Sequence, residues 1–514
     1  MQLVCQRAAR KCLSTLDGAE QEVSVCSDGC PLMDALSKPL PNAEDKVILI
    51  SMQARGSDST VAAQRAALLQ RGMPFRTLLV ICLLLSGFGG AVCVGQSAPV
   101  AHAPAAQAVT RDSAQRGPAY SLPPDKLKRA EALNRDFDWL WAAGTVWSVV
   151  YLLLFLRLHW AAKLSCFASL WAGPRWVQGL IFLPLLVIAI RLLTLPLSLV
   201  GHHLGLAYGL SIERWPAWFW DWTKGLLVSI ATTTLVGSLL FAIVRHSRRR
   251  WWLWFWLLSL PLMLAAVYAE PLIIDPLFNH FEPLSHSHPE LVAQLERVVE
   301  RSGEKIPPDH MFLMKASEKT TELNAYVTGF GSSKRVVVWD TSLKKSTPDE
   351  VLFIFGHELG HYVLGDVVHG LMMAAAGALL ALWLAFHIVN KLVCLYWRRW
   401  EVPAVEDWSA VVVLMLVFTV FSILSDPISN SISRYVEHRA DVYGQEIVHG
   451  IVADPQATAV HSFQTLGEQS LDIPHPNPWM VFWTYNHPPI ANRAEFARDY
   501  DPWKPGGHPR FFSK

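Results

Sequence analysis

One short run, His357-Glu-Leu-Gly-His361, holds two imidazoles and a carboxylate at a spacing that suits zinc chemistry. Residues four apart in an α-helix share a face, so both histidines can reach one zinc ion. Glu358 lies beside them and can take a proton from a zinc-bound water, whose pKa the metal lowers. A peptide bond needs this activated water because its carbonyl is a poor electrophile. The run indicates a zinc peptidase; the alternative interpretation is two histidines on a helix surface.

The residues before this run predict the helix that it requires. Thr347-Pro348-Asp349-Glu350 places a threonine where it can cap a helix and a proline at the first helical position. The glutamate three residues after the cap completes a capping box. Apolar residues 351–355 follow, so we expect one helix to run from this start through both histidines.

A catalytic zinc needs a third protein ligand. Glu437 and Asp441 lie four apart on a predicted helix after the last long apolar segment. Glu437 can bind the metal, while Asp441 can hold the free nitrogen of a ligand histidine. His438 is a rival ligand, but one helical step rotates it about 100° from Glu437. The other interpretation is a charged, solvent-exposed helix, and these residues alone leave both open.

The elements that position these residues belong to a membrane protein. Of 514 residues, 52% are hydrophobic and only 17% are charged. A net charge of +1 gives no general attraction to nucleic acid. Seven apolar segments have the length that crosses a bilayer core. They are 78–94, 139–157, 176–200, 223–244, 251–270, 370–393 and 408–426.

The amino-terminal part differs in character from the rest. Residues 1–72 are polar and irregular, and we leave them unassigned. Residues 73–98 have the basic start, apolar middle and small-residue exit of a secretory signal peptide, and they can equally be a first membrane span. One hypothesis is that Met73 is the true start and that the preceding segment is a start-site artefact. A linker rich in proline and alanine is expected over 99–138.

The remaining chain divides into membrane and catalytic parts. We expect membrane helices over 139–270 and a transmembrane hairpin over 370–426. The polar regions 271–369 and 427–514 then form one split, zincin-like catalytic domain, the first part with the two histidines and the second with the third ligand. Short strand-like segments such as 335–339 predict a small β-sheet in this mainly α-helical domain. The predicted fold is an all-α multi-pass membrane protein with this domain attached.

Basic residues in the short loops predict the orientation. Arg245-His-Ser-Arg-Arg-Arg250 joins two spans, and Arg398-Arg399 lies between the last two. Such loops lie in the cytoplasm by the positive-inside rule. The catalytic domain is therefore expected on the extracytoplasmic side, as a signal-type start at Met73 also predicts.

Over about residues 125–500, the chain resembles the CAAX prenyl protease 1 family of integral-membrane zinc metalloproteases, of the gluzincin type. Several motifs occur in the order of that family: His203-Leu-Gly-Leu-Ala-Tyr-Gly-Leu-Ser211, Pro271 to Asn279, Asn324-Ala-Tyr326, His357 to His361, Glu437 with Asp441, and His487-Pro-Pro489 with Arg493. The resemblance implies a ring of membrane helices around a water-filled chamber into which one Zn²⁺ site faces. The eukaryotic members are understood to face the cytosol, and the basic loops of this chain depart from that.

The resemblance also implies roles that the residues alone do not. His487 and Arg493 would stabilise the oxyanion of the tetrahedral intermediate. Asn324, Ala325 and Tyr326 would lie at an edge strand that pairs with the substrate backbone.

The leading hypothesis is a membrane zinc endopeptidase acting on peptides or proteins. Its substrates would be prenylated carboxyl-terminal tails or misfolded membrane and secreted proteins; an extracytoplasmic site favours the second, because prenyl chains are attached in the cytosol. Membrane lipid is the other expected partner, and nucleic acid is not one. The alternative is a non-hydrolytic membrane protein with structural zinc, but such sites have four protein ligands, and three are evident. A transporter would show repeated spans, and we find none.

Overall fold

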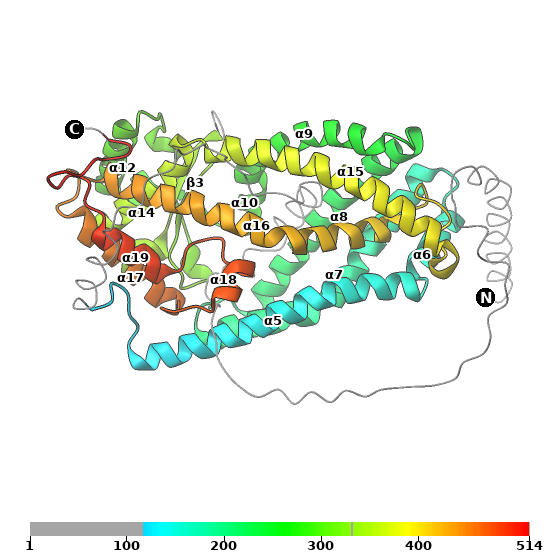
Figure 1. The fold of residues 1–514 in the computed structure, drawn as a ribbon, viewed down its shortest axis with the longest axis horizontal. Coiled ribbons are helices and arrows are strands. Elements are labelled where there is room, and N and C mark those ends of the chain that lie inside the picture. Colours follow the sequence, from blue (N-terminus) through cyan, green and yellow to red (C-terminus); the bar gives the residue numbers. More distant parts are fainter. Residues whose placement is uncertain (1–116, 330–332, 513–514) are drawn as a thin grey trace.

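A computed structural model describes residues 117–329 and 333–512 of the chain (Figure 1). The expectations for residues 1–72 and 73–98 lie outside the described residues and stay predictions. Within the described part, six helices are long and apolar enough to cross a membrane, which confirms the six spans predicted after residue 138. They are α5 (Pro124–Arg157), α7 (Arg175–Tyr208), α8 (Trp215–His246), α9 (Trp251–Ala269), α15 (Asp366–Trp400) and α16 (Ala410–Ile447). α9 continues through a π-helix (Glu270–Ile274) into α10 (Asp275–Phe278).

The long helices lie side by side, with the sheet and the short helices gathered at one end and α6 (Trp160–Trp171) at the other (Figure 1). The basic loop between α8 and α9 contacts the α15–α16 loop at the end of the molecule where α6 lies. There Arg248 Nε lies 2.8 Å from Glu406 Oε1, and the Arg245 guanidinium lies 4.4 Å from the ring centre of Trp408. The basic loops therefore lie at the end of the molecule away from the sheet.

The helix α5 starts earlier than expected and shortens the linker. It begins at Pro124, so the second part of the predicted linker 99–138 is helical. Its first turns are polar, which hid them from a search for apolar segments. Their buried residues Ala130, Leu133 and Phe137 pack into the same core as the sheet-bearing end. This part of α5 therefore packs with the sheet-bearing end of the molecule.

The loop between α7 and α8 is held against the segment that precedes the third strand. Ser211 forms an isolated antiparallel bridge with Thr320, and Ile212 N–H donates to the Lys319 carbonyl at 3.0 Å. Lys319 Nζ in turn pairs with the carboxylate of Asp221 on α8. Glu213, in the same loop, is buried, and burial raises its pKa from 4.5 to about 7 although the Lys319 ammonium lowers it.

A four-stranded sheet lies beside these helices, as predicted. Its strands are β1 (Phe281–Pro283), β2 (Met311–Met314), β3 (Ala325–Thr328) and β4 (Arg335–Trp339), in the order β1-β2-β4-β3. β2 and β4 are parallel, and the outer pairings are antiparallel. All five residues of β4 are buried, in keeping with the apolar residues that follow Arg335 in this strand. β3 is an edge strand of this sheet.

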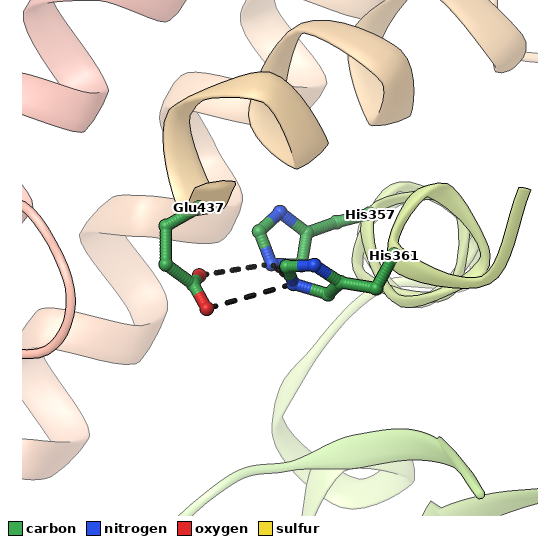
Figure 2. Close-up of side chains that lie close together, drawn as sticks. All are labelled: His357, His361 and Glu437. Atoms are coloured by element: carbon green, nitrogen blue, oxygen red, sulfur yellow. Dashed lines mark hydrogen bonds and ion pairs between the residues drawn. The ribbon is translucent and has the colours of Figure 1, made fainter. Parts of the chain in front are cut away.

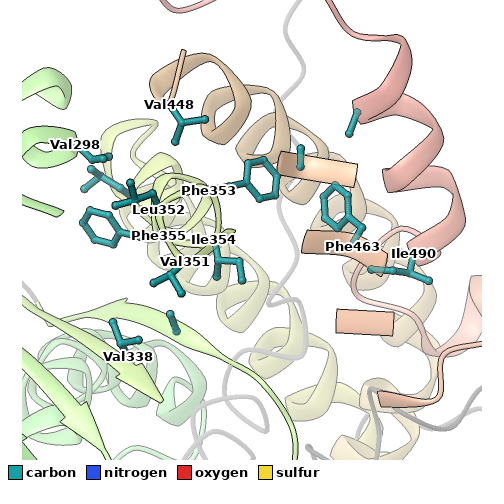
Figure 3. Packing of buried hydrophobic residues seen from close by; sticks show 14 of the residues in the cluster. Val298, Val338, Val351, Leu352, Phe353, Ile354, Phe355, Val448, Phe463 and Ile490 are labelled. Atoms are coloured by element: carbon teal, nitrogen blue, oxygen red, sulfur yellow. The ribbon is translucent and has the colours of Figure 1, made fainter. Parts of the chain in front are cut away.

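One core binds the sheet to helices from both polar regions. Val351, Phe353 and Phe355 of α14 (Pro348–Val363) are buried among residues of the other helices (Figure 3). The Phe353 ring meets Phe463 edge-to-face, with 5.4 Å between ring centres. Segments separated by the membrane hairpin thus share one packed interior. The remaining helices here are α11 (Leu284–Ser287), α12 (Pro289–Ser302), α13 (Asp340–Lys345), α14 (Pro348–Val363), α17 (Pro455–Ser470), α18 (Pro478–Thr484) and α19 (Ile490–Asp499).

The end of α16 holds the carboxyl-terminal tail. Glu446 is fully buried, and its carboxylate accepts hydrogen bonds from the backbone N–H of Arg510 and Phe511, both at 2.7 Å, and of Phe512 at 3.1 Å. The hydroxyl of Tyr500 donates to the same group. One buried anion therefore fixes three successive backbone N–H groups of the tail.

Candidate metal centre

The helix α14 begins as predicted. Thr347 caps it: its hydroxyl accepts from the Glu350 N–H at 3.3 Å, and the Glu350 carboxylate accepts from the Thr347 N–H at 3.4 Å. Residues 351–360 are buried except for Glu358, which is half-buried. Packing of the apolar residues on their neighbours fixes the rotation of α14. That rotation turns both histidines toward α16 and leaves the Glu358 carboxylate accessible.

The helix α16 is one continuous element of 38 residues that includes Pro427. The predicted helix carrying Glu437 and Asp441 is therefore the direct extension of the last membrane span. Ser431 Oγ donates to the Pro427 carbonyl at 2.7 Å, the bond to the carbonyl four residues earlier that serine makes within a helix.

Glycines bring α14 and α16 close together. A Cβ atom on Gly444 of α16 would lie 2.9 Å from the backbone nitrogen of His357. A Cβ atom on Gly356 of α14 would lie 2.7 Å from Cγ2 of Ile447. Each glycine thus allows an approach that a larger residue would prevent. This close approach of the two helices was not predicted from the sequence.

Two imidazoles and one carboxylate converge between these helices (Figure 2). Nε2 of His357 lies 3.2 Å from Oε2 of Glu437 and 3.3 Å from Nε2 of His361, which lies 3.5 Å from Oε1 of Glu437. Atoms that are each roughly 2.0–2.1 Å from a tetrahedral zinc are roughly 3.3–3.4 Å apart. The spacing of these donors therefore fits a zinc ion, and the sequence-predicted ligands lie together.

The ionisation of the group also suits a cation. Burial raises the pKa of Glu437, but the His487 and His357 imidazoles outweigh burial and hold it well below 4.5. Burial lowers the pKa of His357, yet hydrogen bonds to Asp441 and Glu437 raise it to about 10. The carboxylate is thus ionised, and in the metal-free protein His357 carries a proton that a metal must displace.

Asp441 holds the outer nitrogen of a ligand candidate. Its Oδ1 lies 2.9 Å from Nδ1 of His357, the contact that the four-residue spacing predicts. Arg493 of α19 donates to both oxygens of this carboxylate, from Nε at 2.9 Å and from Nη2 at 2.5 Å. Burial raises the pKa of Asp441, but the Arg493 guanidinium and His357 outweigh that effect and lower it.

The two residues predicted for the oxyanion lie at the same centre. Nε2 of His487 is 3.1 Å from Oε2 of Glu437, and its side chain is 32% exposed, so a substrate can reach it. Nη2 of Arg493 is 3.9 Å from the same Glu437 oxygen. The paired hydrogen bonds between Arg493 and Asp441 make this arginine a support for Asp441. The oxyanion role of both residues stays a prediction.

One carboxylate at this centre has no counterpart among the residues predicted from the sequence. Oδ2 of Asp366 lies 3.0 Å from Nδ1 of His361. The signal was present, because Gly365-Asp366 follows the second histidine closely and marks the end of one helix and the start of the next. Nothing in the spacing itself showed that the chain would turn back far enough for this contact.

The predicted substrate-binding residues lie at the edge strand. Ala325 and Tyr326 belong to β3, and Asn324 precedes it, with its carbonyl accepting from the Trp339 N–H at 3.1 Å. Among the described residues, no strand pairs with the second edge of β3. The Tyr326 hydroxyl donates to Asp275 Oδ2 at 3.0 Å, so its side chain anchors the strand to α10.

Comparisons with known proteins agree along the chain. The family model "Peptidase family M48" matches residues 285–501, and "CAAX prenyl protease N-terminal, five membrane helices" matches residues 114–280. "Uncharacterized metalloprotease YhfN" of Bacillus subtilis is 33% identical over 389 residues, covering 74% of this chain and 88% of the relative.

More distant relatives carry a more specific name. "CAAX prenyl protease 1 homolog" of Oryza sativa is 27% identical over 417 residues, covering 78% of this chain and 91% of the relative. "CAAX prenyl protease 1" of Saccharomyces cerevisiae is 25% identical over 343 residues, covering 63% and 72%. The crystal structure of S. mikatae Ste24p superposes with a TM-score of 0.65 at 20% identity, covering 86% of this chain and all of that one, and it shares the fold.

Proposed function

Because the chain belongs to peptidase family M48 and is a membrane metallopeptidase, we propose that its metal is zinc, held by His357, His361 and Glu437. The resemblance to the CAAX prenyl protease 1 family is confirmed by the family model for the amino-terminal membrane helices and by the relatives from Oryza sativa and Saccharomyces cerevisiae. The observation that carries the zinc proposal is the convergence of two imidazole nitrogens and one carboxylate, whose nearest atoms lie 3.2–3.5 Å apart. Two imidazoles and one carboxylate are the ligands of catalytic zinc sites that keep a position open.

When bound, zinc supplies Lewis acidity and lowers the pKa of water. Glu358 takes the proton of the attacking water while the water oxygen bonds to the peptide carbonyl carbon. The same carboxylate then gives a proton to the leaving nitrogen as the carbon–nitrogen bond breaks. The half-buried position of Glu358 next to buried His357 supports this role. His487 and Arg493 stabilise the oxyanion that forms on the substrate carbonyl.

The substrate backbone pairs with β3. The strand lies at the sheet edge, and α14, which bears both histidines, packs beside it. An extended peptide added to this edge would gain main-chain hydrogen bonds at Ala325, because the N–H and carbonyl of Asn324 are already bonded to Ser342 and Trp339, while its scissile bond faces the metal. This arrangement binds the interior of a chain, so the activity is an endopeptidase activity.

Replacing Glu358 tests the hydrolytic mechanism. Glu358→Gln keeps the shape of the side chain and removes the base, so zinc content stays at the wild-type level while cleavage of a fluorogenic peptide falls roughly 10²- to 10⁴-fold. Glu290→Gln, at an exposed position of α12, is the matched control and keeps the wild-type rate. A wild-type rate in Glu358→Gln would refute the mechanism. Hydrolysis is favoured over a purely structural zinc by the family match.

The side of the membrane decides the substrate class. The basic loops lie at the end away from the site, which supports an extracytoplasmic centre acting on membrane or secreted proteins. The CAAX names of the relatives support the second candidate, cleavage of prenylated tails, which requires a cytosolic centre.

Cysteine labelling in intact cells separates these candidates. Lys504→Cys marks the catalytic end and Arg249→Cys the opposite end, and both positions are exposed. We expect an impermeant maleimide to add label, over the unsubstituted protein, at position 504 and not at 249. The reverse pattern would place the centre in the cytosol and favour prenylated tails.

A further inference from the structure

Asp366 is placed to control the orientation of His361. Its Oδ2 lies 3.0 Å from Nδ1 of that imidazole. Figure 2 shows the other ring nitrogen turned toward Glu437, at 3.5 Å from Oε1. A carboxylate on Nδ1 fixes the tautomer that presents the Nε2 lone pair to a metal.

The chain turn that delivers this carboxylate is specific. Gly365 adopts a φ of 71°, a left-handed conformation that favours glycine, between the end of α14 and the start of α15. The Asp366 side chain is 10% exposed, so little water competes for it. Arg439 of α16 approaches its other oxygen, with Nη1 3.7 Å from Oδ1. The carboxylate is thus held between an imidazole and a guanidinium.

The arrangement repeats the one around the other histidine. His357 has Asp441 on Nδ1, backed by Arg493, and His361 has Asp366 on Nδ1. The two carboxylates come from different helices, α16 and α15, so they do not form one cluster. Each imidazole therefore has its own anionic partner, and the two partners can be removed separately.

We propose that Asp366 is a positioning residue that sets the ring orientation of His361 and thereby strengthens zinc binding at the centre. The inference rests on the proposed zinc site. Because Asp366 is the first residue of the membrane helix α15, it also couples the second imidazole directly to the membrane hairpin.

The test measures zinc binding to the full-length protein in detergent, by competition with a chromophoric chelator. Asp366→Ala removes the hydrogen bond, and its zinc dissociation constant rises roughly 10- to 100-fold. Asp366→Asn keeps an acceptor without the charge and has a smaller effect. The absorption bands of bound Co²⁺ also shift in Asp366→Ala, because the ligand field at His361 changes. Zinc affinity and Co²⁺ bands equal to those of the wild type in Asp366→Ala would overturn the proposal.

Two further variants keep the outcomes distinct. Asp454→Ala removes the capping aspartate of α17, so it lowers stability and leaves zinc affinity unchanged. If Asp454→Ala lost as much zinc affinity as Asp366→Ala, the loss would reflect lower stability alone and would overturn the role of Asp366. His361→Ala tests the zinc site itself. If His361→Ala loses zinc and Asp366→Ala does not, the site stands and the positioning role fails. If His361→Ala binds zinc like the wild type, the proposed site fails.

Discussion

Replacing Gly444 with alanine tests how closely α14 and α16 must approach for the histidines to face Glu437. Gly444 lies two helical turns after Glu437 on the same face of α16. The added Cβ atom would lie 2.9 Å from the backbone nitrogen of His357 and 3.0 Å from its Cα. These are backbone atoms of a packed helix, so no side-chain rotation relieves the contact and the two helices must separate.

The size of the effect follows from these distances. Ordinary van der Waals contact begins at 3.4 Å, so a contact of 2.9 Å requires the helices to move apart by about 0.5 Å. Zinc ligands tolerate deviations of only about 0.2 Å. To bind the metal, the variant must bring the two helices back to their close approach. Overpacking of this kind costs about 1–3 kcal/mol of binding free energy. This cost corresponds to a roughly 5- to 150-fold weaker zinc affinity.

The assay is chelator competition for zinc on the purified variant, with peptide cleavage measured at saturating zinc. Gly370→Ala, on α15, is the matched control because no atom lies within 4 Å of its added Cβ. It reports the general gain in helix stability of about 1 kcal/mol when alanine replaces glycine. Equal zinc affinity in the two variants would refute the reasoning that the approach at Gly444 positions Glu437.

Three other predictions concern charged groups. Burial raises the pKa of Glu213 from 4.5 to about 7, so its contribution to stability falls as pH rises through this range; Glu213→Gln should gain thermal stability relative to the wild type between about pH 5 and about pH 8 in unfolding scans, and a constant difference would contradict this. Glu446→Gln loses at least one charge-assisted hydrogen bond, worth about 1.5–3 kcal/mol, so carboxypeptidase should remove residues 510–512 faster, as mass spectrometry would detect; an unchanged rate would contradict it. Zinc must displace the proton of His357, whose pKa is about 10 in the metal-free protein. The dissociation constant of zinc should therefore fall about tenfold for each unit that the pH rises between about pH 6 and about pH 9. A zinc dissociation constant that does not change with pH would show that zinc displaces no proton from His357.

Local patterns carried most of what the sequence predicted correctly. The capping box at Thr347 and the four-residue spacing of the histidines depend on neighbours within one helix, so they can be recognised without a structure. The same spacing predicted that Asp441 would contact a ligand histidine, which it does. Apolar length alone located the six described spans.

Other features depended on contacts between distant segments. The predicted boundary between the last membrane span and the catalytic part fell at residue 427, yet α16 continues through Pro427 as one helix. The first turns of α5 have a polar sequence, and they were therefore predicted to be a linker. In the structure they pack against the sheet-bearing end. Gly444 acts through the close approach of α14 and α16, and Asp366 acts through the turn between α14 and α15. The spacing of residues along the sequence predicts neither contact.

The hairpin formed by α15 and α16 begins and ends at the same centre. Asp366 opens it beside His361, and Glu437 follows the part that crosses the membrane. During synthesis the proposed third ligand therefore emerges only after both hairpin helices have been made, and it reaches the histidines only once they have turned across the bilayer. A nascent chain, or one whose hairpin fails to insert, holds an incomplete set of ligands. Assembly of the proposed metal site thus depends on the fold of the membrane hairpin.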